Sequence, residues 1–311
     1  MPASERVPEV GLSPGTEALV HGELTVRGQV RDASNAVLFC ETEYEGRALA
    51  CVYKPVAGER PLWDFPDGTL AQREVAAYLV SEATGWGLVP PTVLRDGPYG
   101  EGMVQLWIDP PDLTADTDSG TDTDTDTEAG PDEAPDAAAD TNSDTDADAG
   151  PAQSELFGLT EDTEPAPGWK PVVEARLENG RTALLVHADD IRLRRLAVLD
   201  AVINNADRKG GHLLQTADGR LYGIDHGVTF HTEDKLRTLL WGWAGEPLPD
   251  EAVAVLRKLQ AELSGALGDR LAELITPAET AAVRARTERL LRSGVHPEPG
   301  GEWPSIPWPP V

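Results

Sequence analysis

The chain has 311 residues and a formal net charge of −28, long enough to bury a substantial core and to form two lobes. This charge excludes the basic footprint of a nucleic-acid-binding protein and disfavours contact with an anionic membrane surface. Much of the charge is local, because residues 109–148 contain 15 acidic residues and no Lys or Arg, which leaves −13 for the rest.

The two cysteines and the N-terminus bear on the compartment. Cys40 and Cys51 each stand in an apolar segment, so we expect buried thiols rather than a disulfide framework or a zinc site. The N-terminus has Glu5 and Glu9 without an apolar core, unlike a signal peptide. No apolar run approaches the roughly 18 residues of a membrane span, so we expect a cytoplasmic protein without a transmembrane segment.

The first part of the chain is predicted to be rich in β-strands. Residues 1–19 are polar and contain prolines, and we expect a loose lead-in there. Residues 69–84 favour a helix that Thr69 caps and Gly85 ends. Apolar runs between turn residues such as Glu45-Gly46 predict five strands, at 23–30, 36–40, 48–54, 93–95 and 103–108.

Residues 110–153 are a low-complexity tract of Asp-Thr dipeptides. Almost no large apolar residues occur in it, so burial could not offset the entropy lost on ordering, and we expect a disordered acidic insert. Its acidity is also typical of an interaction tail for a protein partner.

The remaining chain, residues 154–295, is predicted to be mainly helical. An apolar stripe of helical period covers 187–205, and Pro249 and Pro277 mark the starts of helices at 251–263 and 278–291. Between them, the apolar runs on either side of Asp218-Gly219 predict a β-hairpin. Residues 296–311 form a tail rich in Pro and Trp, which is either loose or packed on the body.

Four ionisable residues occur in the order that a phosphoryl-transfer site requires. Lys54 ends a predicted strand, Glu74 lies early in the predicted helix, and Asp207 and Asp225 stand at the two ends of the hairpin. In such sites the Lys holds ATP phosphates and pairs with the Glu, one Asp orients the acceptor hydroxyl, and the other holds Mg²⁺.

Two short motifs carry a resemblance to a known family. Asp207-Arg208, followed by Ile224-Asp225-x-Gly227, resembles the Asp-Arg-His-x-x-Asn and Ile-Asp-Phe-Gly elements of the phosphatidylinositol 3-/4-kinase superfamily. The stretches 58–66 and 73–78 resemble an uncharacterised, mainly actinobacterial branch of that superfamily. The resemblance covers most of residues 20–290 outside the acidic tract.

The resemblance implies an α+β, two-lobed protein-kinase-like fold. The N-lobe, residues 20–109, would be a β-sheet with one helix, and the C-lobe would be mainly helical and carry the catalytic hairpin. The implied cofactors are ATP and Mg²⁺ or Mn²⁺. The implied partners are this nucleotide and an unidentified hydroxyl acceptor, which could be a protein, a lipid or a small metabolite.

Three positions depart from the motifs of the superfamily. Lys209 stands where the superfamily has His, His212 where it has a metal-binding Asn, and His226 where it has Phe. Imidazole is a poor Mg²⁺ ligand but acceptable to Mn²⁺ or Zn²⁺. We assign the metal to Asp225 and His212, and Asn204 or Asn205 is the alternative for the second contact. Lys209 is assigned with Asp207 to catalysis, because a cation there would neutralise the migrating phosphoryl group.

The remaining candidate residues would contact the nucleotide. Ser34 and Asn35, in a predicted turn between strands, could cover the phosphates with backbone amides. Gln105 and Trp107 would form the hinge beside adenine. Two other functions stay open: a nucleotide-binding pseudokinase or scaffold without turnover, favoured by the departures at 209 and 212, and transfer of AMP instead of phosphate.

Overall fold

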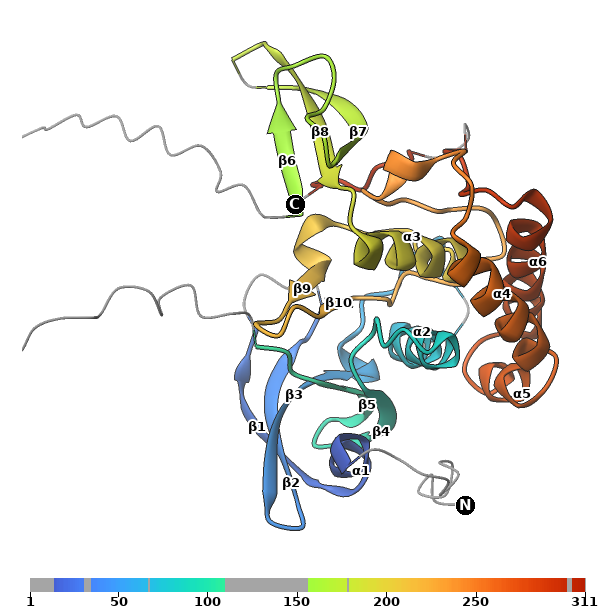
Figure 1. Cartoon of the computed structure of the whole chain (residues 1–311). Helices are drawn as coiled ribbons and strands as arrows, with labels where there is room; N and C mark the ends of the chain where they lie inside the picture. The colour runs from blue at the N-terminus through green and yellow to red at the C-terminus, as the bar shows by residue number, and fades with distance from the viewer. Residues whose placement is uncertain are drawn as a thin grey trace, which may run out of the picture.

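The computed structural model describes residues 14–30, 35–66, 68–109, 156–177, 179–300 and 304–310. They form a mixed fold of six α-helices and antiparallel sheets. The largest sheet has the strand order β1-β2-β3-β5-β4 and lies to one side of α2, with the later helices beyond it (Figure 1). Its strands are β1 (Glu23–Gln29), β2 (Leu38–Tyr44), β3 (Arg47–Pro55), β4 (Thr92–Gly97) and β5 (Gly100–Leu106).

This sheet confirms the five predicted strands, with shifts of a few residues at their ends. β2 and β3 turn at Glu45-Gly46 as predicted, and Cys40 is paired directly with Cys51 across them. Both thiols are free and buried, and burial raises the pKa of Cys40 to about 11. Since the thiolate is the reactive form, these cysteines act as small apolar core residues.

The predicted lead-in is wrong for its last residues, because Pro14–His21 form the helix α1. Leu19 is fully buried in a small core with β2, β3, β4 and β5. The Thr42 hydroxyl donates a hydrogen bond of 2.8 Å to the carbonyl of Ala18. Prolines and polar residues favour a loose segment, but one apolar face of two helical turns is enough to dock it on the sheet.

The helix α2 (Leu70–Thr84) has the boundaries that its capping residues predict. Thr69 and Gln72 form a capping box, and Gly85 ends the helix at φ 76°, a left-handed conformation that glycine adopts without strain. Both carboxylate oxygens of Glu59 accept from the first backbone amides of the helix, those of Leu70 and Ala71. These bonds fix the start of α2, and therefore the position of Glu74 one turn later.

The segment that follows the acidic tract is not helical at first, which corrects the prediction of a mainly helical region. It forms a three-stranded sheet of order β6-β8-β7, which projects away from the rest of the molecule (Figure 1). The strands are β6 (Phe157–Thr160), β7 (Trp169–Arg176) and β8 (Thr182–Ala188). The helix predicted over 187–205 is therefore shorter: α3 (Ile191–Ile203) begins after Asp190, whose carboxylate accepts from the amide of Arg192.

The rest of the chain confirms the hairpin and two helices and adds a third. The hairpin is β9 (Leu213–Gln215) with β10 (Leu221–Gly223). The helices are α4 (Asp250–Leu263), α5 (Ala266–Ala272) and α6 (Pro277–Ser293), of which α5 was not predicted. Short 3-10 turns lie at Val56–Gly58, Gly210–His212 and Trp241–Trp243.

The main hydrophobic core joins α2 to the helices that follow in the sequence. Ala76, Ala77 and Val80 of α2 belong to one buried cluster with residues of α3, α4 and α6. Trp243 is fully buried in the same cluster. None of the helices in the described ranges is long and apolar enough to cross a membrane.

The acidic insert and Ser34 lie outside the described residues, whereas part of the tail is described. Residues 304–310 pack on the body rather than hanging free, since the carbonyl of Ser305 accepts from the amide of Thr238. Trp308, in contrast, is 82% exposed.

Candidate functional site

Lys54 lies at the centre of the candidate site. It is the penultimate residue of β3, and its Nζ donates to Glu74 Oε1 at 2.8 Å and to Asp225 Oδ1 at 3.0 Å. Burial acts to lower the pKa of Lys54, but the two carboxylates outweigh it and raise the pKa above its usual value. The ammonium is therefore charged and joins the sheet, α2 and the end of the hairpin.

Glu74 is the buried partner of this lysine. Its side chain is almost fully shielded from solvent, and its second oxygen accepts from the backbone amide of His226 at 2.8 Å. Burial raises the pKa of Glu74, and the ammonium of Lys54 acts against that shift. Both carboxylate oxygens are occupied, so Glu74 fixes Lys54 on one side and the Asp225-His226-Gly227 segment on the other.

Asp225 presents its carboxylate to both the lysine and solvent. It follows β10 with φ at 60°, a left-handed conformation that is uncommon for residues other than glycine and clusters at functional sites. The side chain is half-exposed. The ammonium of Lys54, opposed by partial burial, holds the pKa of Asp225 well below its usual range, so this carboxylate is a permanent anion with an accessible oxygen.

His212 faces the second oxygen of Asp225. Its Nε2 lies 3.4 Å from Asp225 Oδ2, and its Nδ1 accepts from the amide of Lys209 at 3.5 Å. This places the ring proton on Nε2. Burial lowers the pKa of His212 although Asp225 acts in the opposite direction, so the ring is neutral near pH 7 and able to bind a metal after a change of tautomer.

Asp207 and Lys209 lie in the loop between α3 and the 3-10 turn that ends at His212. They form an ion pair of 3.2 Å with both side chains partly exposed. The amide of Asp207 donates to Asn205 Oδ1 at 3.0 Å, which holds the loop after α3. Asp207 and Asp225 both act to raise the pKa of His212, and the contact with the ring itself comes from Asp225.

Arg208 makes more buried hydrogen bonds than the sequence indicates. It is fully buried and donates to both oxygens of Asp200 at 2.9 and 3.0 Å. It also donates to the carbonyls of Ile224 at 3.0 Å and His212 at 3.3 Å, one at each end of the hairpin. Its Nη2 lies 2.6 Å from His226 Nε2, which accepts, because arginine can only donate. Arg208 thus sets the separation of the two acids.

Three side chains that were predicted to contact the nucleotide contact other groups of the protein instead. The Asn35 side chain accepts from the amide of Arg60 at 3.0 Å. Gln105 is buried and donates to the Thr92 hydroxyl at 2.8 Å. The indole of Trp107 packs edge-on against Phe39 at 5.1 Å. The structure does not bring these three side chains to Lys54 through any contact among the described residues, and their nucleotide contacts stay predictions.

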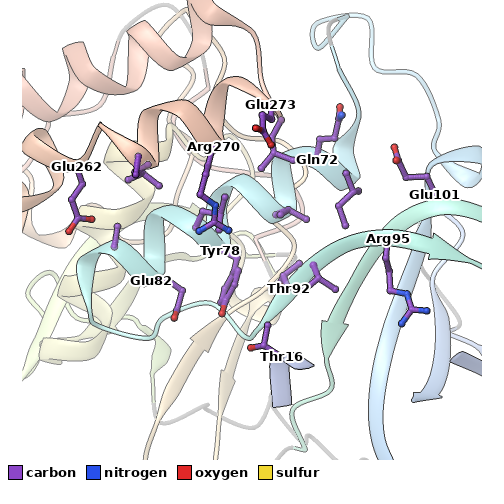
Figure 2. Close-up of a pocket in the computed structure, with 18 of the residues that line it drawn as sticks. Thr16, Gln72, Tyr78, Glu82, Thr92, Arg95, Glu101, Glu262, Arg270 and Glu273 are labelled. Atoms are coloured by element: carbon purple, nitrogen blue, oxygen red, sulfur yellow. The ribbon is translucent and has the colours of Figure 1, made fainter. Parts of the chain in front are cut away.

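A cavity of about 790 Å³ is lined by residues of α2, β4, α4 and α5. Figure 2 shows Tyr78 and Glu82 projecting from α2 towards it, with Arg95 and Arg270 also at its walls. None of the nine predicted site residues in the described ranges lines this cavity, although Gln72 and Val75, which lie near Glu74 in α2, do. The cavity therefore does not mark the place where the ionisable residues converge.

The described residues contain no group of three or more His, Cys, Asp or Glu side chains arranged to hold a metal. Asp225 and His212 form a pair only. Such a pair suits an ion that takes its remaining oxygens from phosphates and water, as Mg²⁺ and Mn²⁺ do in nucleotide sites. The residues present therefore fit a metal that arrives with a nucleotide better than one held by the protein alone.

Comparison with known proteins places the chain beside one curated relative. Protein Rv2133c of Mycobacterium tuberculosis (strain ATCC 25618 / H37Rv) is 50% identical over 291 residues, which are 94% of this chain and 93% of that protein. No family model matches the chain. The chain also matches a solved structure, the crystal structure of the golgi casein kinase, over 88% of this chain and 72% of that chain, with 12% sequence identity and a TM-score of 0.36. Membership of the phosphatidylinositol 3-/4-kinase superfamily stays a prediction.

Proposed function

We propose that this chain, which belongs to the family of Protein Rv2133c of Mycobacterium tuberculosis, is an ATP-dependent phosphotransferase with a two-lobed protein-kinase-like arrangement. One observation carries the proposal: Lys54 Nζ lies within 3.0 Å of both Glu74 and Asp225, which are 20 and 171 residues away in sequence. A lysine held by a helix glutamate beside a half-exposed aspartate is the arrangement that binds ATP phosphates and their metal.

Each residue has a role that follows from its surroundings. Lys54 holds the phosphates, and Glu74 keeps its ammonium in place. Asp207 accepts the proton of the acceptor hydroxyl as the hydroxyl oxygen bonds to the γ-phosphorus and the bond to the β-phosphate oxygen breaks. Lys209, paired with Asp207 in the absence of substrate, stabilises the charge on the phosphoryl group during transfer.

Asp225 and His212 would hold the metal. Their donor set, a carboxylate oxygen and an imidazole nitrogen, favours Mn²⁺ over Mg²⁺. When bound, the metal would neutralise phosphate charge. The His212 proton now on Nε2 would move to Nδ1 on binding, which ends the 3.5 Å hydrogen bond from the Lys209 amide.

The test is ADP release by the purified chain with ATP and either Mn²⁺ or Mg²⁺, with hydroxyl acceptors of several classes and with water alone. We expect release that Asp225→Ala abolishes. Asp218→Ala is the matched control, because Asp218 lies in the turn of the same hairpin with an exposed side chain. Release that survives Asp225→Ala, or its absence in every condition, would reject a phosphotransferase.

A second function, nucleotide binding without turnover, is favoured by one observation. The carboxylate of Asp207 is already paired with Lys209 at 3.2 Å, so this ion pair would have to open before Asp207 could meet an acceptor hydroxyl. Thermal stabilisation of the chain by ATP with Mn²⁺, with no ADP formed by any acceptor, would support this function over transfer.

A further inference from the structure

The C-terminal segment Pro304–Pro310 lies against the loop that carries Asp207 and Lys209. We propose that this segment is a positioning element of the site, which holds the loop where Asp207 meets the acceptor. The inference rests on the proposed phosphotransferase function. It adds a part of the chain that is about 100 residues from the loop in sequence and that none of the motifs includes.

The direct link is a single backbone hydrogen bond. The amide of Gly210 donates to the carbonyl of Pro310 at 2.9 Å. Gly210 follows Lys209 and begins the 3-10 turn that ends at His212. An amide at the start of such a turn has no partner within the turn, so the carbonyl of the tail supplies the acceptor that the loop lacks.

The tail reaches this position because it is anchored before Pro310. The carbonyl of Ser305 accepts from the amide of Thr238 at 3.1 Å and from the Trp241 indole at 2.9 Å. Arg237 Nη2 donates to the carbonyl of Ile306 at 3.3 Å. Ile306 packs against the main hydrophobic core. These contacts leave the last residues little freedom, so the bond to Gly210 costs little entropy.

The tail also supports the loop indirectly, through the segment 237–239. The amide of Arg208 donates to the carbonyl of Arg237 at 3.0 Å, and the amide of Leu239 donates to the carbonyl of Arg208 at 3.3 Å. The segment 237–239 therefore lies between the loop and the tail and is hydrogen-bonded to both. Removing the tail would therefore take away its direct bond to the loop at Gly210 and also its support of the segment 237–239, which is bonded to the loop at Arg208.

The contacts also predict which kinetic step depends on the tail. Within the described part of the chain, the tail contacts residue 210, residues 237–241 and the main core. Lys54 and Glu74, which would hold the nucleotide, are held by each other and by α2, with no contact to the tail among the described residues. Loss of the tail should therefore impair phosphoryl transfer and leave nucleotide binding unchanged.

The experiment compares the full chain with two truncations in the ADP-release assay with Mn²⁺ and water as acceptor. One truncation removes Pro310 and Val311 and takes away only the acceptor of Gly210. The other ends at Gly300 and removes the whole tail. Trp308→Ala is the matched control, because its ring is in the same segment but exposed. Hydrogen exchange at the Gly210 amide reports the contact itself.

We expect kcat to fall roughly 10- to 100-fold in the truncations, as for a displacement of about 1 Å in a reacting group, with KM for ATP unchanged and faster exchange at Gly210. Trp308→Ala should match the full chain. A synthetic peptide of residues 301–311 should restore part of kcat to the longer truncation. Because the shorter truncation keeps the anchors at Ser305 and Ile306, it covers the case in which the longer one fails to fold.

The two possible failures differ. The inference is overturned if the shorter truncation keeps the full kcat, if KM for ATP rises in step with the loss of kcat, or if exchange at Gly210 is unchanged. The proposed function fails instead if the full chain releases no ADP.

Discussion

Arg208 is the residue on which the geometry of the candidate site most depends. Its guanidinium joins α3, through Asp200, to both ends of the hairpin. A buried arginine–carboxylate pair contributes little net stability when intact, but the loss of one partner leaves a buried charge without compensation. Arg208 therefore acts as a spacer between Asp207 and Asp225. The pair of Arg208 with Asp200 carries a cost in folding stability that appears only when one partner is removed.

Replacing Arg208 should expose this cost. We expect Arg208→Met to lower the free energy of unfolding by about 3 to 5 kcal/mol, because Asp200 is then left buried and unpaired. Urea unfolding followed by circular dichroism measures the change. Arg220→Met is the control, since Arg220 is exposed and pairs with Asp218 on the surface, where an ion pair contributes about 0 to 1 kcal/mol.

A second variant separates charge from shape at this site. The double change Arg208→Met with Asp200→Leu removes both partners, so it should cost clearly less than the sum of the two single changes. The buried network does not hold the hairpin if the double variant loses as much stability as the sum of the two single variants. The same follows if Arg208→Met lowers the free energy of unfolding by less than about 1 kcal/mol.

At the scale of elements, α2 is the piece that links the sheet to the helices. Its Arg73 forms a buried ion pair of 2.6 Å with Glu279 of α6 and donates to the carbonyl of Thr229. Glu74, the next residue, faces Lys54. The side chain that anchors the helix and the side chain that serves the site are therefore neighbours, and a rotation of α2 would disturb both.

Breaking the anchor of α2 should lower both stability and turnover. We expect Glu279→Ala to cost about 3 to 5 kcal/mol, because Arg73 stays buried without its partner, and to reduce ADP release through the displacement of Glu74. Asp234→Ala breaks the exposed pair with Arg289 and should cost less than about 1 kcal/mol. Comparable losses in the two variants would argue that α2 is held by packing alone.

The elements that the sequence predicted well carry their own local signals. The helix α2 has Thr69 and Gly85 at its ends, and the hairpin has Asp218-Gly219 at its turn. The sheet β6-β8-β7 has no such signal in β7, because none of the β7 residues is fully buried and exposed residues lie on both of its faces, so no alternation results. Pro171 lies inside β7 beside a register shift, which also disfavoured a strand.

Part of the candidate site could likewise be predicted from the sequence, and part could not. The order of Lys54, Glu74, Asp207 and Asp225 could be found in the sequence because each stands beside a recognisable element. The contact of Gly210 with Pro310 could not, because it joins two backbone groups, and backbone groups are the same in every residue. The buried bonds of Arg208 to Asp200 and His226 also depend on the fold, since three separate segments meet there.

At the scale of the whole molecule, the main core is shared by the chain on both sides of residues 110–155. The apolar face of α2, from the first part, is buried among α3, α4 and α6, from the second. Polar contacts cross the same boundary, including Lys54 with Asp225 and Lys235 with Asp64 at 3.3 Å. The two parts should therefore associate without the segment that connects them.

This arrangement predicts that the chain can be divided. We expect residues 1–109 and 156–311, produced together as separate chains, to purify as a one-to-one complex that retains thermal stabilisation by ATP with Mn²⁺. Residues 1–109 produced alone should aggregate, because Ala77, Leu79 and Val80 of α2 would then face water. Size-exclusion chromatography and differential scanning calorimetry measure both outcomes.

A matched variant tests whether the shared core is the cause. Val80→Asp in residues 1–109 would place a charge in the core cluster without touching the site, and should prevent the complex from forming, because an unpaired charge is strongly disfavoured in an apolar core. Glu101→Lys, at an exposed position near the start of β5, should leave the complex intact. If residues 1–109 fold alone and do not bind residues 156–311, then the covalent link rather than the core of α2 holds Glu74 opposite Asp225.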